Sequence, residues 1–362
     1  MSKKILIVDD SALMRRVLCD IINSDKRYEI AGQASNGVEA FDLLSRNTYD
    51  AVILDIYMPK MNGIDLLKKM HQHSISARVL IVSTYALKGT QITLDALNLG
   101  AMDFVHKPEN TMAFQEDGFK NHFLQLLEAV LNSEVPVFKP DPSYDKNKAD
   151  MIIRTESSQK YAVNASGKEI VAIASSTGGP KALHELIPKL PADLNAPVLV
   201  VQHMPKGFTA SLADRLNAMS DIRVKEAEDG EELKSGVVYF ARGGSHMNIR
   251  KSAKGCVVQY SDEPPREGVK PCANYMYESL IDCPYERVVC VVMTGMGADG
   301  TQGIEHLKAK KKVYVISQDE ASCTVYGMPK SVERAGLSDK VVTLEQIAQE
   351  IIAQVGRSPQ QR

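Results

Sequence analysis

Short apolar runs that alternate with helical patterns constrain this chain more than any other feature. Such runs recur from "KILIV" near the start to "KVYVIS" near the end, and stretches with apolar residues at helical spacing separate them. Strands of this kind are buried on both faces, which requires helices on both sides of a parallel sheet. We therefore predict an α/β fold, and a length of 362 residues favours two domains over one.

A polar stretch divides the alternation into two series. Residues 133–168 are rich in Pro, Ser, Asn and Lys without a sustained period, which indicates an interdomain linker. The first series, 1–132, fits five β/α units and predicts a five-stranded, parallel, flavodoxin-like sheet. The second series, 169–356, predicts a doubly wound, mostly parallel sheet, and its shorter, turn-broken strands between 223 and 261 suggest an antiparallel edge. Residues 357–362 are expected to form a C-terminal tail.

Composition argues against several classes of protein. The net charge of −2 gives no reason to expect nucleic-acid binding, and no apolar run approaches the length of a membrane span. The six cysteines are scattered without a C-x-x-C pair, which favours a reduced cytoplasmic protein over a disulfide scaffold or a zinc site. We expect a monomer that does not insert into membranes.

Polar side chains gather at the strand ends of the first series. They are Asp9 and Asp10 after "KILIV", Asp55 at the end of "DAVILD", Ser83 at the end of "ARVLIVS" and Lys107 at the end of "DFVHK". Ligands of open parallel sheets bind at this edge, and clustered carboxylates need a cation such as Mg²⁺, which leaves room for a phosphate oxygen. An aspartate can itself accept a phosphoryl group, and a lysine can neutralise the developing charge. Each residue alone reads as a helix cap or a turn, but together they indicate a phosphoryl-transfer site.

The segments "VDD", "LDIYMPKMNG", "VST" and "FVHKP" resemble the receiver domain of two-component response regulators. This resemblance implies that Asp55 is the phosphoacceptor, that a chemotaxis histidine kinase is the phosphodonor, and that Lys107–Pro108 is a cis peptide. It assigns further roles to matching positions: Mg²⁺ ligands at Asp9, Asp10 and Asp55, and switch residues at Ser83, Phe104 and Lys107.

The stretch "SSTGGP", residues 175–180, ends an apolar run in the second series. It lacks the lysine of a P-loop and the spacing of a dinucleotide motif, although the start of a helix there could bind an anion. The alternative is a serine nucleophile, which needs a base, a group that orients the base, and donors for the oxyanion. His203 follows "PVLVVQ", and Asp299 lies in a glycine-rich turn after "RVVCVVMTGM", so the three groups can converge at the strand ends.

Several residues compete for these roles. Ser175 and Ser176 are both candidates for the nucleophile. His246, in the predicted loop "RGGSHMN", and His184, in a predicted helix, compete with His203 for the role of the base. The order Ser, His, Asp along the chain differs from that of α/β-hydrolases, but triads are defined by geometry rather than by order.

The segments "IASSTGGP", "VVQHMPKGFTASLADRLN", "VVMTGMGADGTQGI" and "SQDEASCTVYGMP" resemble the catalytic domain of the chemotaxis protein-glutamate methylesterase family. The resemblance implies that Ser176 is the nucleophile, His203 the base and Asp299 the orienting acid. It places the oxyanion hole at the backbone N–H groups of Met296 and Thr177, and it implies no cofactor for ester hydrolysis.

The two resemblances together imply an enzyme that removes methyl groups from glutamate γ-methyl esters of methyl-accepting chemotaxis receptors, releases methanol and deamidates receptor glutamines. Phosphorylation of Asp55 would activate it by relieving masking by the receiver. Two segments depart from the family pattern, and both are expected near the rim of the active site: "KPCAN", residues 270–274, replaces R-P-S-V-D, and Arg242 replaces the proline of A-P-G. These departures leave a catalytically inactive, receptor-binding adaptor as the alternative. A transcriptional regulator is disfavoured, because residues 169–355 offer strands rather than a basic DNA-reading helix.

Overall fold

The computed structural model describes residues 2–83, 87–108, 117–133, 135, 169–253 and 255–357. The chain divides into two units, Met1–Asp145 and Lys146–Arg362, which are described separately. Nearly all of the predicted linker and most of the predicted C-terminal tail lie outside the described residues, so the domain limits stay predictions.

The N-terminal unit alternates strands and helices as predicted. Its elements are β1 Lys3–Val8, α1 Ala12–Asn23, β2 Tyr28–Ala34, α2 Gly37–Arg46, β3 Ala51–Leu54, α3 Gly63–Gln72, β4 Val79–Ser83, α4 Leu87–Asn98, β5 Asp103–His106 and α5 Asp117–Asn132. The five strands are all parallel, in the order β2-β1-β3-β4-β5, so the predicted flavodoxin-like sheet is confirmed.

Burial explains why these elements assemble. The strands β1, β3 and β4 are apolar on both faces, and apolar side chains of α1 and α5 pack with them in one core cluster. The start of α1 is fixed by Ser11, whose hydroxyl accepts a hydrogen bond from the Met14 N–H at 3.3 Å. Because all strands run in one direction, their carboxyl ends form one edge of the sheet.

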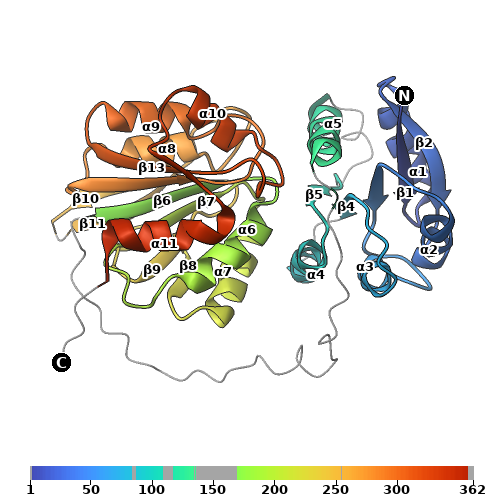
Figure 1. Ribbon diagram of the computed structural model, residues 1–362, viewed down its shortest axis with the longest axis horizontal. Coiled ribbons are helices and arrows are strands. Elements are labelled where there is room, and N and C mark those ends of the chain that lie inside the picture. The colour runs from blue at the N-terminus through green and yellow to red at the C-terminus, as the bar shows by residue number, and fades with distance from the viewer. Residues whose placement is uncertain are drawn as a thin grey trace. The chain divides into compact units, whose positions relative to one another are not determined.

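The C-terminal unit is a larger α/β layer structure. Its elements are β6 Glu169–Ser175, α6 Gly179–Leu186, η2 Ile187–Lys189, β7 Val198–Gln202, α7 Phe208–Met219, β8 Arg223–Glu226, β9 Val237–Phe240, β10 His246–Ser252, β11 Gly255–Ser261, α8 Ala273–Ser279, β12 Arg287–Val292, α9 Thr301–Lys308, β13 Lys312–Gln318, α10 Met328–Arg334, β14 Lys340–Val342 and α11 Leu344–Val355. The main sheet has seven strands in the order β14-β13-β12-β6-β7-β9-β8. Helices α8, α9 and α10 cover one face, and α6, α7 and α11 cover the other (Figure 1).

The antiparallel part of this unit lies within the expected residues, 223–261, but it is a separate sheet and not an edge of the main sheet. Every pairing within the seven-stranded sheet is parallel, including β8 with β9, which forms the predicted edge. The antiparallel pair is the hairpin β10–β11, which is a separate two-stranded sheet. Residues 227–236 separate the two parallel strands β8 and β9, and part of this segment pairs with β11, where the Leu233 N–H donates to the Cys256 carbonyl at 3.0 Å.

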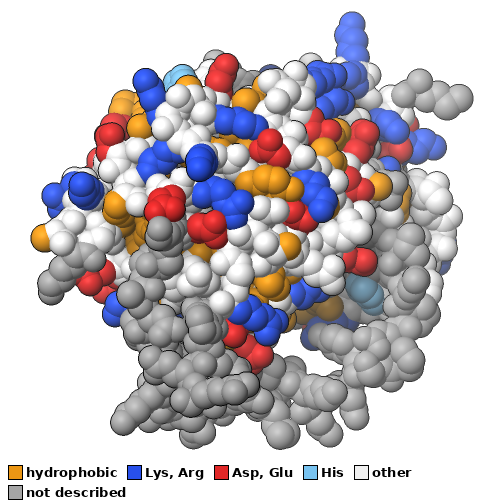
Figure 2. Space-filling view, turned by 60° about the vertical axis from the view of Figure 1, so that its left-hand side comes forward, with side chains coloured by type: hydrophobic (Ala, Val, Ile, Leu, Met, Phe, Trp, Pro, Cys, Tyr) orange, Lys and Arg blue, Asp and Glu red, His pale blue; other side chains and the backbone are white. Residues whose placement is uncertain are grey.

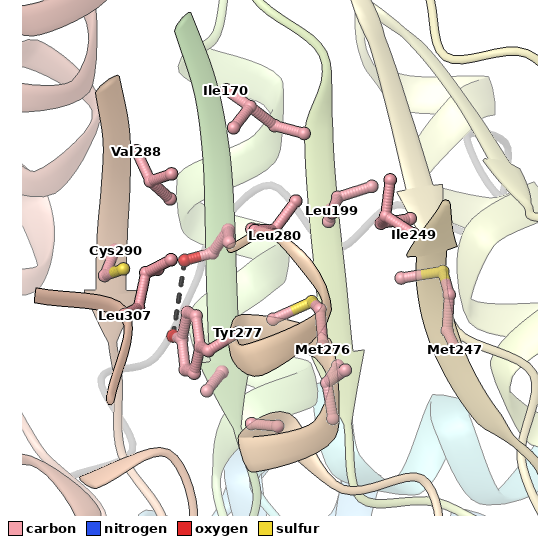
Figure 3. Packing of buried hydrophobic residues seen from close by; sticks show 14 of the residues in the cluster. Ile170, Leu199, Met247, Ile249, Met276, Tyr277, Leu280, Val288, Cys290 and Leu307 are labelled. Carbon is pink, nitrogen blue, oxygen red and sulfur yellow. Dashed lines mark hydrogen bonds between the residues drawn. The ribbon is translucent and has the colours of Figure 1, made fainter. Parts of the chain in front are cut away.

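The core of the C-terminal unit fixes helix α8 to the sheet (Figure 3). Tyr277 of α8 is fully buried, and its hydroxyl lies 3.3 Å from the carbonyl oxygen of Ala172 in β6 and 3.2 Å from that of Val291 in β12. Tyr277 belongs to one cluster of buried apolar residues from the strands, the helices and the hairpin, among them Leu199, Met247, Met276 and Leu307. The start of α8 is therefore held in place by the core.

The described helices contain no membrane-spanning segment, and the face shown in Figure 2 carries charges of both signs. Among the described residues, no helix has both the length and the apolar character needed to cross a membrane. On the face shown in Figure 2, Lys and Arg side chains are interspersed with Asp and Glu, and the hydrophobic side chains are scattered.

Candidate active site

The turn after β6 presents Ser176 at the carboxyl edge of the seven-stranded sheet. Ser176 is partly exposed, and its backbone N–H donates to the Thr294 carbonyl at 3.0 Å. Gly178 has a φ of +76°, which only glycine adopts readily. A Cβ on Gly179 would overlap the side-chain amide oxygen of Gln202. The two glycines of "SSTGGP" are thus required by the turn and by close packing.

His203 and Asp299 come together at the same edge. His203 directly follows β7, the neighbour of β6, and its backbone N–H donates to the Ser175 carbonyl at 3.1 Å. Its Nε2 lies 2.7 Å from Oδ2 of Asp299, which follows β12 on the other side of β6. The structure therefore brings the predicted nucleophile, base and acid to the ends of three adjacent strands.

The carboxylate of Asp299 is buried and saturated with donors. Its Oδ1 accepts from the Cys272 thiol at 3.0 Å and the Asn274 N–H at 2.9 Å. Its Oδ2 accepts from the Ala273 N–H at 2.6 Å and from His203. Burial acts to raise the pKa of Asp299, but the hydrogen bonds from His203, Ala273 and Cys272 outweigh it and hold that pKa below its usual value. Asp299 is therefore ionised at neutral pH and has a fixed orientation.

Gln202 is a residue of this site that the sequence reasoning missed. Its Oε1 accepts from the Ser175 hydroxyl at 2.7 Å, and its Nε2 donates to the carbonyls of Ser176 at 3.0 Å and His203 at 3.3 Å. A single buried amide thus links the turn after β6 to the turn after β7. The available signal was a glutamine at the end of an apolar run, where a polar side chain needs partners.

The predicted oxyanion donors lie in two turns that hydrogen bonds hold together. The Thr294 hydroxyl donates to the carbonyl of Thr177 at 2.9 Å. A Cβ on Gly295 would lie only 2.8 Å from Cβ of Ser176, so the turn that leads to Met296 runs directly against Ser176. Neither the Thr177 nor the Met296 N–H donates to any acceptor in the described parts of the chain. Both are available to bind a negatively charged oxygen.

The loop after β13 is hydrogen-bonded to the turn that contains Gly295. Gly295 donates its N–H to the Val325 carbonyl at 3.0 Å and accepts from the N–H groups of Gly327 and Met328 at 3.0 and 2.8 Å. The segment "SQDEASCTVYGMP" therefore supports the turn that leads to Met296 through backbone hydrogen bonds.

The competing residues are engaged in other contacts. The Ser175 hydroxyl is buried against Gln202. His184 in α6 has its Nδ1 2.8 Å from the Pro180 carbonyl. His246 is not in a loop, as predicted, but is the first residue of β10, fully buried, with Nε2 3.3 Å from the Pro264 carbonyl and its ring 4.6 Å from that of Tyr275. Its strand pairing and burial assign it to the core of the hairpin.

The two departures from the family pattern occupy different surroundings. Residues 270–274 carry three of the four donors to Asp299, so this segment contacts the triad itself and not only the rim. Arg242 donates its backbone N–H to the Tyr260 hydroxyl at 2.9 Å, a bond that a proline could not make, and its guanidinium lies 4.6 Å from the centre of that ring.

The acidic pocket of the N-terminal unit forms as predicted from the strand ends. Carboxylate oxygens of Asp9, Asp10 and Asp55 lie within 4.8 Å of one another. Lys107 Nζ lies 2.7 Å from Oδ2 of Asp9 and 2.7 Å from Oδ2 of Asp55. Burial lowers the pKa of Lys107, but its pairing with Asp55 and Asp9 outweighs burial and raises that pKa.

The charges of this pocket fit a hard divalent cation. Burial raises the pKa of Asp55, and Lys107 offsets this effect only in part. Three carboxylates facing one lysine leave excess negative charge, and oxygen ligands are those that Mg²⁺ prefers. The donor set is therefore suitable for Mg²⁺ at Asp9, Asp10 and Asp55.

The other predicted receiver residues border the pocket strands. Ser83 ends β4 and is buried, with no hydrogen-bond partner for its hydroxyl in the described parts of the chain, and Phe104 is buried in β5. The predicted cis Lys107–Pro108 peptide is wrong, because Lys270–Pro271 is the one cis peptide within the described residues. A trans bond is the lower-energy form even before proline.

Known proteins resemble the chain over nearly its whole length. The family described as "CheB methylesterase" matches residues 171–351, and "Response regulator receiver domain" matches residues 5–116. A "Protein-glutamate methylesterase/protein-glutamine glutaminase" of Bacillus subtilis is 41% identical over 352 residues, covering 96% of this chain and 97% of that protein. A protein of the same description, numbered 1, from Syntrophomonas wolfei is 39% identical over 360 residues, covering 97% and 99%. The solved "CheB methylesterase catalytic domain" of Thermotoga maritima is 42% identical, with a TM-score of 0.51, covering 52% of this chain and all of that one.

Proposed function

The chain belongs to the CheB methylesterase family and carries a response-regulator receiver domain, and from this premise we propose that it is a phosphorylation-regulated protein-glutamate methylesterase. Its substrates are glutamate γ-methyl esters on methyl-accepting chemotaxis receptors, and its product is methanol. The observation that carries the proposal is the 2.7 Å bond between His203 and the buried Asp299, at the sheet edge that presents Ser176.

The hydrogen bond between His203 and Asp299 supports one direction of proton transfer. Because Nε2 of His203 is bound to the carboxylate of Asp299, Nδ1 is the ring nitrogen that takes the hydroxyl proton of Ser176. As the proton leaves, Ser176 Oγ bonds to the ester carbonyl carbon and the carbonyl oxygen becomes an oxyanion. The N–H groups of Met296 and Thr177 stabilise this oxyanion, a contribution of about 10²- to 10³-fold per donor.

The second half of the reaction reverses these roles. The C–O bond to the methoxy group breaks, and the protonated His203 gives its proton to that oxygen, so methanol departs. Water then attacks the glutamyl ester of Ser176 with His203 again as the base, which frees the glutamate and restores the hydroxyl. The same steps with a glutamine substrate release ammonia, so we include deamidation in the proposed activity. An amide reacts more slowly because its leaving nitrogen must be protonated.

We propose that the receiver controls this activity through Asp55. A chemotaxis histidine kinase supplies the phosphoryl group, the Asp55 carboxylate accepts it, and Lys107 neutralises charge on the transferred group. Asp9, Asp10 and Asp55 would hold Mg²⁺, which would bind a phosphoryl oxygen and reduce its negative charge. Phosphorylation shifts a two-state equilibrium in which the receiver masks the esterase. All six cysteines are free thiols, which supports a cytoplasmic location, and we expect a monomer.

The test is methanol release from methylated receptor membranes, measured with and without acetyl phosphate and Mg²⁺. We expect basal release, stimulation by the phosphodonor, and loss of both in Ser176→Ala. The Asp55→Asn variant should keep basal release and lose stimulation. Receptor binding without methanol release in the unaltered chain would instead support the inactive adaptor.

A further inference from the structure

Cys272 touches the triad at a point where a weak donor is unexpected. The residue is fully buried, immediately before the first residue of α8, and its Sγ lies 3.0 Å from Oδ1 of Asp299. A carboxylate only accepts hydrogen bonds, so the thiol is the donor. A thiol is a weaker donor than the serine hydroxyl that the family pattern R-P-S-V-D has at this position.

We propose that Cys272 is a positioning residue, whose thiol fixes the orientation of the Asp299 carboxylate and so aims Oδ2 at His203. This inference rests on the proposed function. It adds a fourth side chain, that of Cys272, to the three side chains of the proposed triad.

The distribution of donors over the carboxylate supports this role. Oδ1 is held by the Cys272 thiol and by the Asn274 N–H, while Oδ2 is held by the Ala273 N–H and by His203. Cys272 is the only side chain besides His203 among the four donors. Turning the carboxylate about its Cβ–Cγ bond would break the thiol bond at once, so the thiol resists that rotation.

The frame that carries the thiol is rigid. The side-chain oxygen of Asn274 accepts from the N–H groups of Gly300 at 3.1 Å and Gly303 at 2.7 Å, which ties the segment to the turn that carries Asp299. Tyr277, on the same helix, is hydrogen-bonded to β6 and β12. A substitution at residue 272 therefore acts on the carboxylate rather than on the path of the backbone.

The thiol of Cys272 must be protonated to donate a hydrogen bond to Asp299. Burial, together with the adjacent Asp299 charge, raises the pKa of Cys272, so the thiol stays protonated across the working pH range. The group therefore remains a donor whenever the carboxylate is ionised.

The experiment compares Cys272→Ala and Cys272→Ser in the full-length chain, with methanol release from methylated receptor membranes as the readout. We expect kcat of Cys272→Ala to fall about five- to tenfold with KM unchanged, as for the loss of one ordinary hydrogen bond, because a thiol is a weak donor. The acidic limb of its kcat/KM profile should move to higher pH, because a carboxylate with one donor fewer lets the His203–Asp299 pair bind a proton more readily. Cys272→Ser should restore both values.

A matched control separates positioning from packing. Cys290→Ala removes an equally buried sulfur atom from β12 of the same unit, and Cys290 is not a donor to Asp299. It should lower stability without moving the acidic limb. If Cys272→Ala does not fold, Cys272→Val fills the space of the sulfur with methyl groups that cannot donate and should show the same shift of the limb.

The outcomes distinguish this inference from the function on which it rests. A Cys272→Ala or Cys272→Val enzyme whose kcat and acidic limb match those of Cys290→Ala would overturn the positioning role and leave the esterase intact. Methanol release that persists in Ser176→Ala would overturn the esterase assignment itself.

Discussion

The amide of Gln202 offers the sharpest test of how the turns after β6 and β7 are held together. Replacement by leucine keeps a similar volume but removes the acceptor for Ser175 and the donor for the carbonyls of Ser176 and His203. Gln202 is 2% exposed, so water does not readily replace these bonds. A buried polar group without a partner costs about 1–3 kcal/mol of the free energy of unfolding. The two carbonyls lie close to the sheet edge, where water can reach them in part, so we expect Gln202→Leu to lower the free energy of unfolding by about 3 kcal/mol in total.

The effect on the rate should exceed the effect on binding. Ser176 and His203 would no longer share one anchor, and a displacement of about 1 Å between reacting groups costs roughly 10²-fold. We expect kcat of Gln202→Leu to fall by about that factor while KM changes little, since the altered contacts act on the reacting groups and not on the receptor surface.

Two assays measure these quantities on the same protein. Urea unfolding gives the free energy of unfolding, and methanol release gives kcat and KM. Ser175→Ala is the control, because it removes one partner of Gln202 and leaves both carbonyl bonds, with an expected loss of about 1 kcal/mol and nearly normal kcat. If Gln202→Leu folds with normal stability and turns over within twofold of the unaltered chain, the amide does not hold the turns and the reasoning fails.

Three further outcomes follow from the geometry. Asp299→Asn places an NH₂ group among four donors and favours the wrong His203 tautomer, so methanol release should fall about 10³- to 10⁴-fold; a loss below tenfold would contradict the role of the acid. Gly179→Ala should lower the free energy of unfolding in urea by about 1–3 kcal/mol because its Cβ overlaps Gln202, whereas Gly118→Ala, with open space around it, should not; equal stabilities would refute the packing argument. The raised pKa of Asp55 means that the folded receiver binds this proton more tightly than the unfolded chain, so stability falls as pH rises through the carboxylate range. Asp55→Asn should therefore stabilise the receiver against urea at pH 7 and not below about pH 4, and a variant less stable at pH 7 would contradict that sign.

The sequence was sufficient to predict the sheets and the convergence of residues at their edges. Ser176 and His203 directly follow apolar runs that could only be buried strands, and parallel strands bring their carboxyl ends to one edge. The same logic predicted the pocket of Asp9, Asp55 and Lys107, which the structure shows within ion-pair distance.

The remaining features depend on tertiary packing that leaves no periodic signal. Gln202 ends an apolar strand, and only the fold shows that its amide joins two turns. Cys272 appeared to be a departure at the rim, because nothing in the sequence places residue 272 beside residue 299. His246 was predicted in a loop because glycines precede it, yet pairing with Ser261 makes it a strand residue.

The anchoring of α8 has a consequence for how the enzyme loses activity. The first residues of this helix hold the carboxylate of Asp299, the proposed acid of the triad, while Tyr277, one turn later, is hydrogen-bonded to two central strands. The segment that binds Asp299 is therefore not expected to unfold before the rest of the C-terminal unit. In a denaturant titration, catalysis and the tertiary structure of the C-terminal unit should disappear in one transition, which makes turnover a direct gauge of how many molecules remain native.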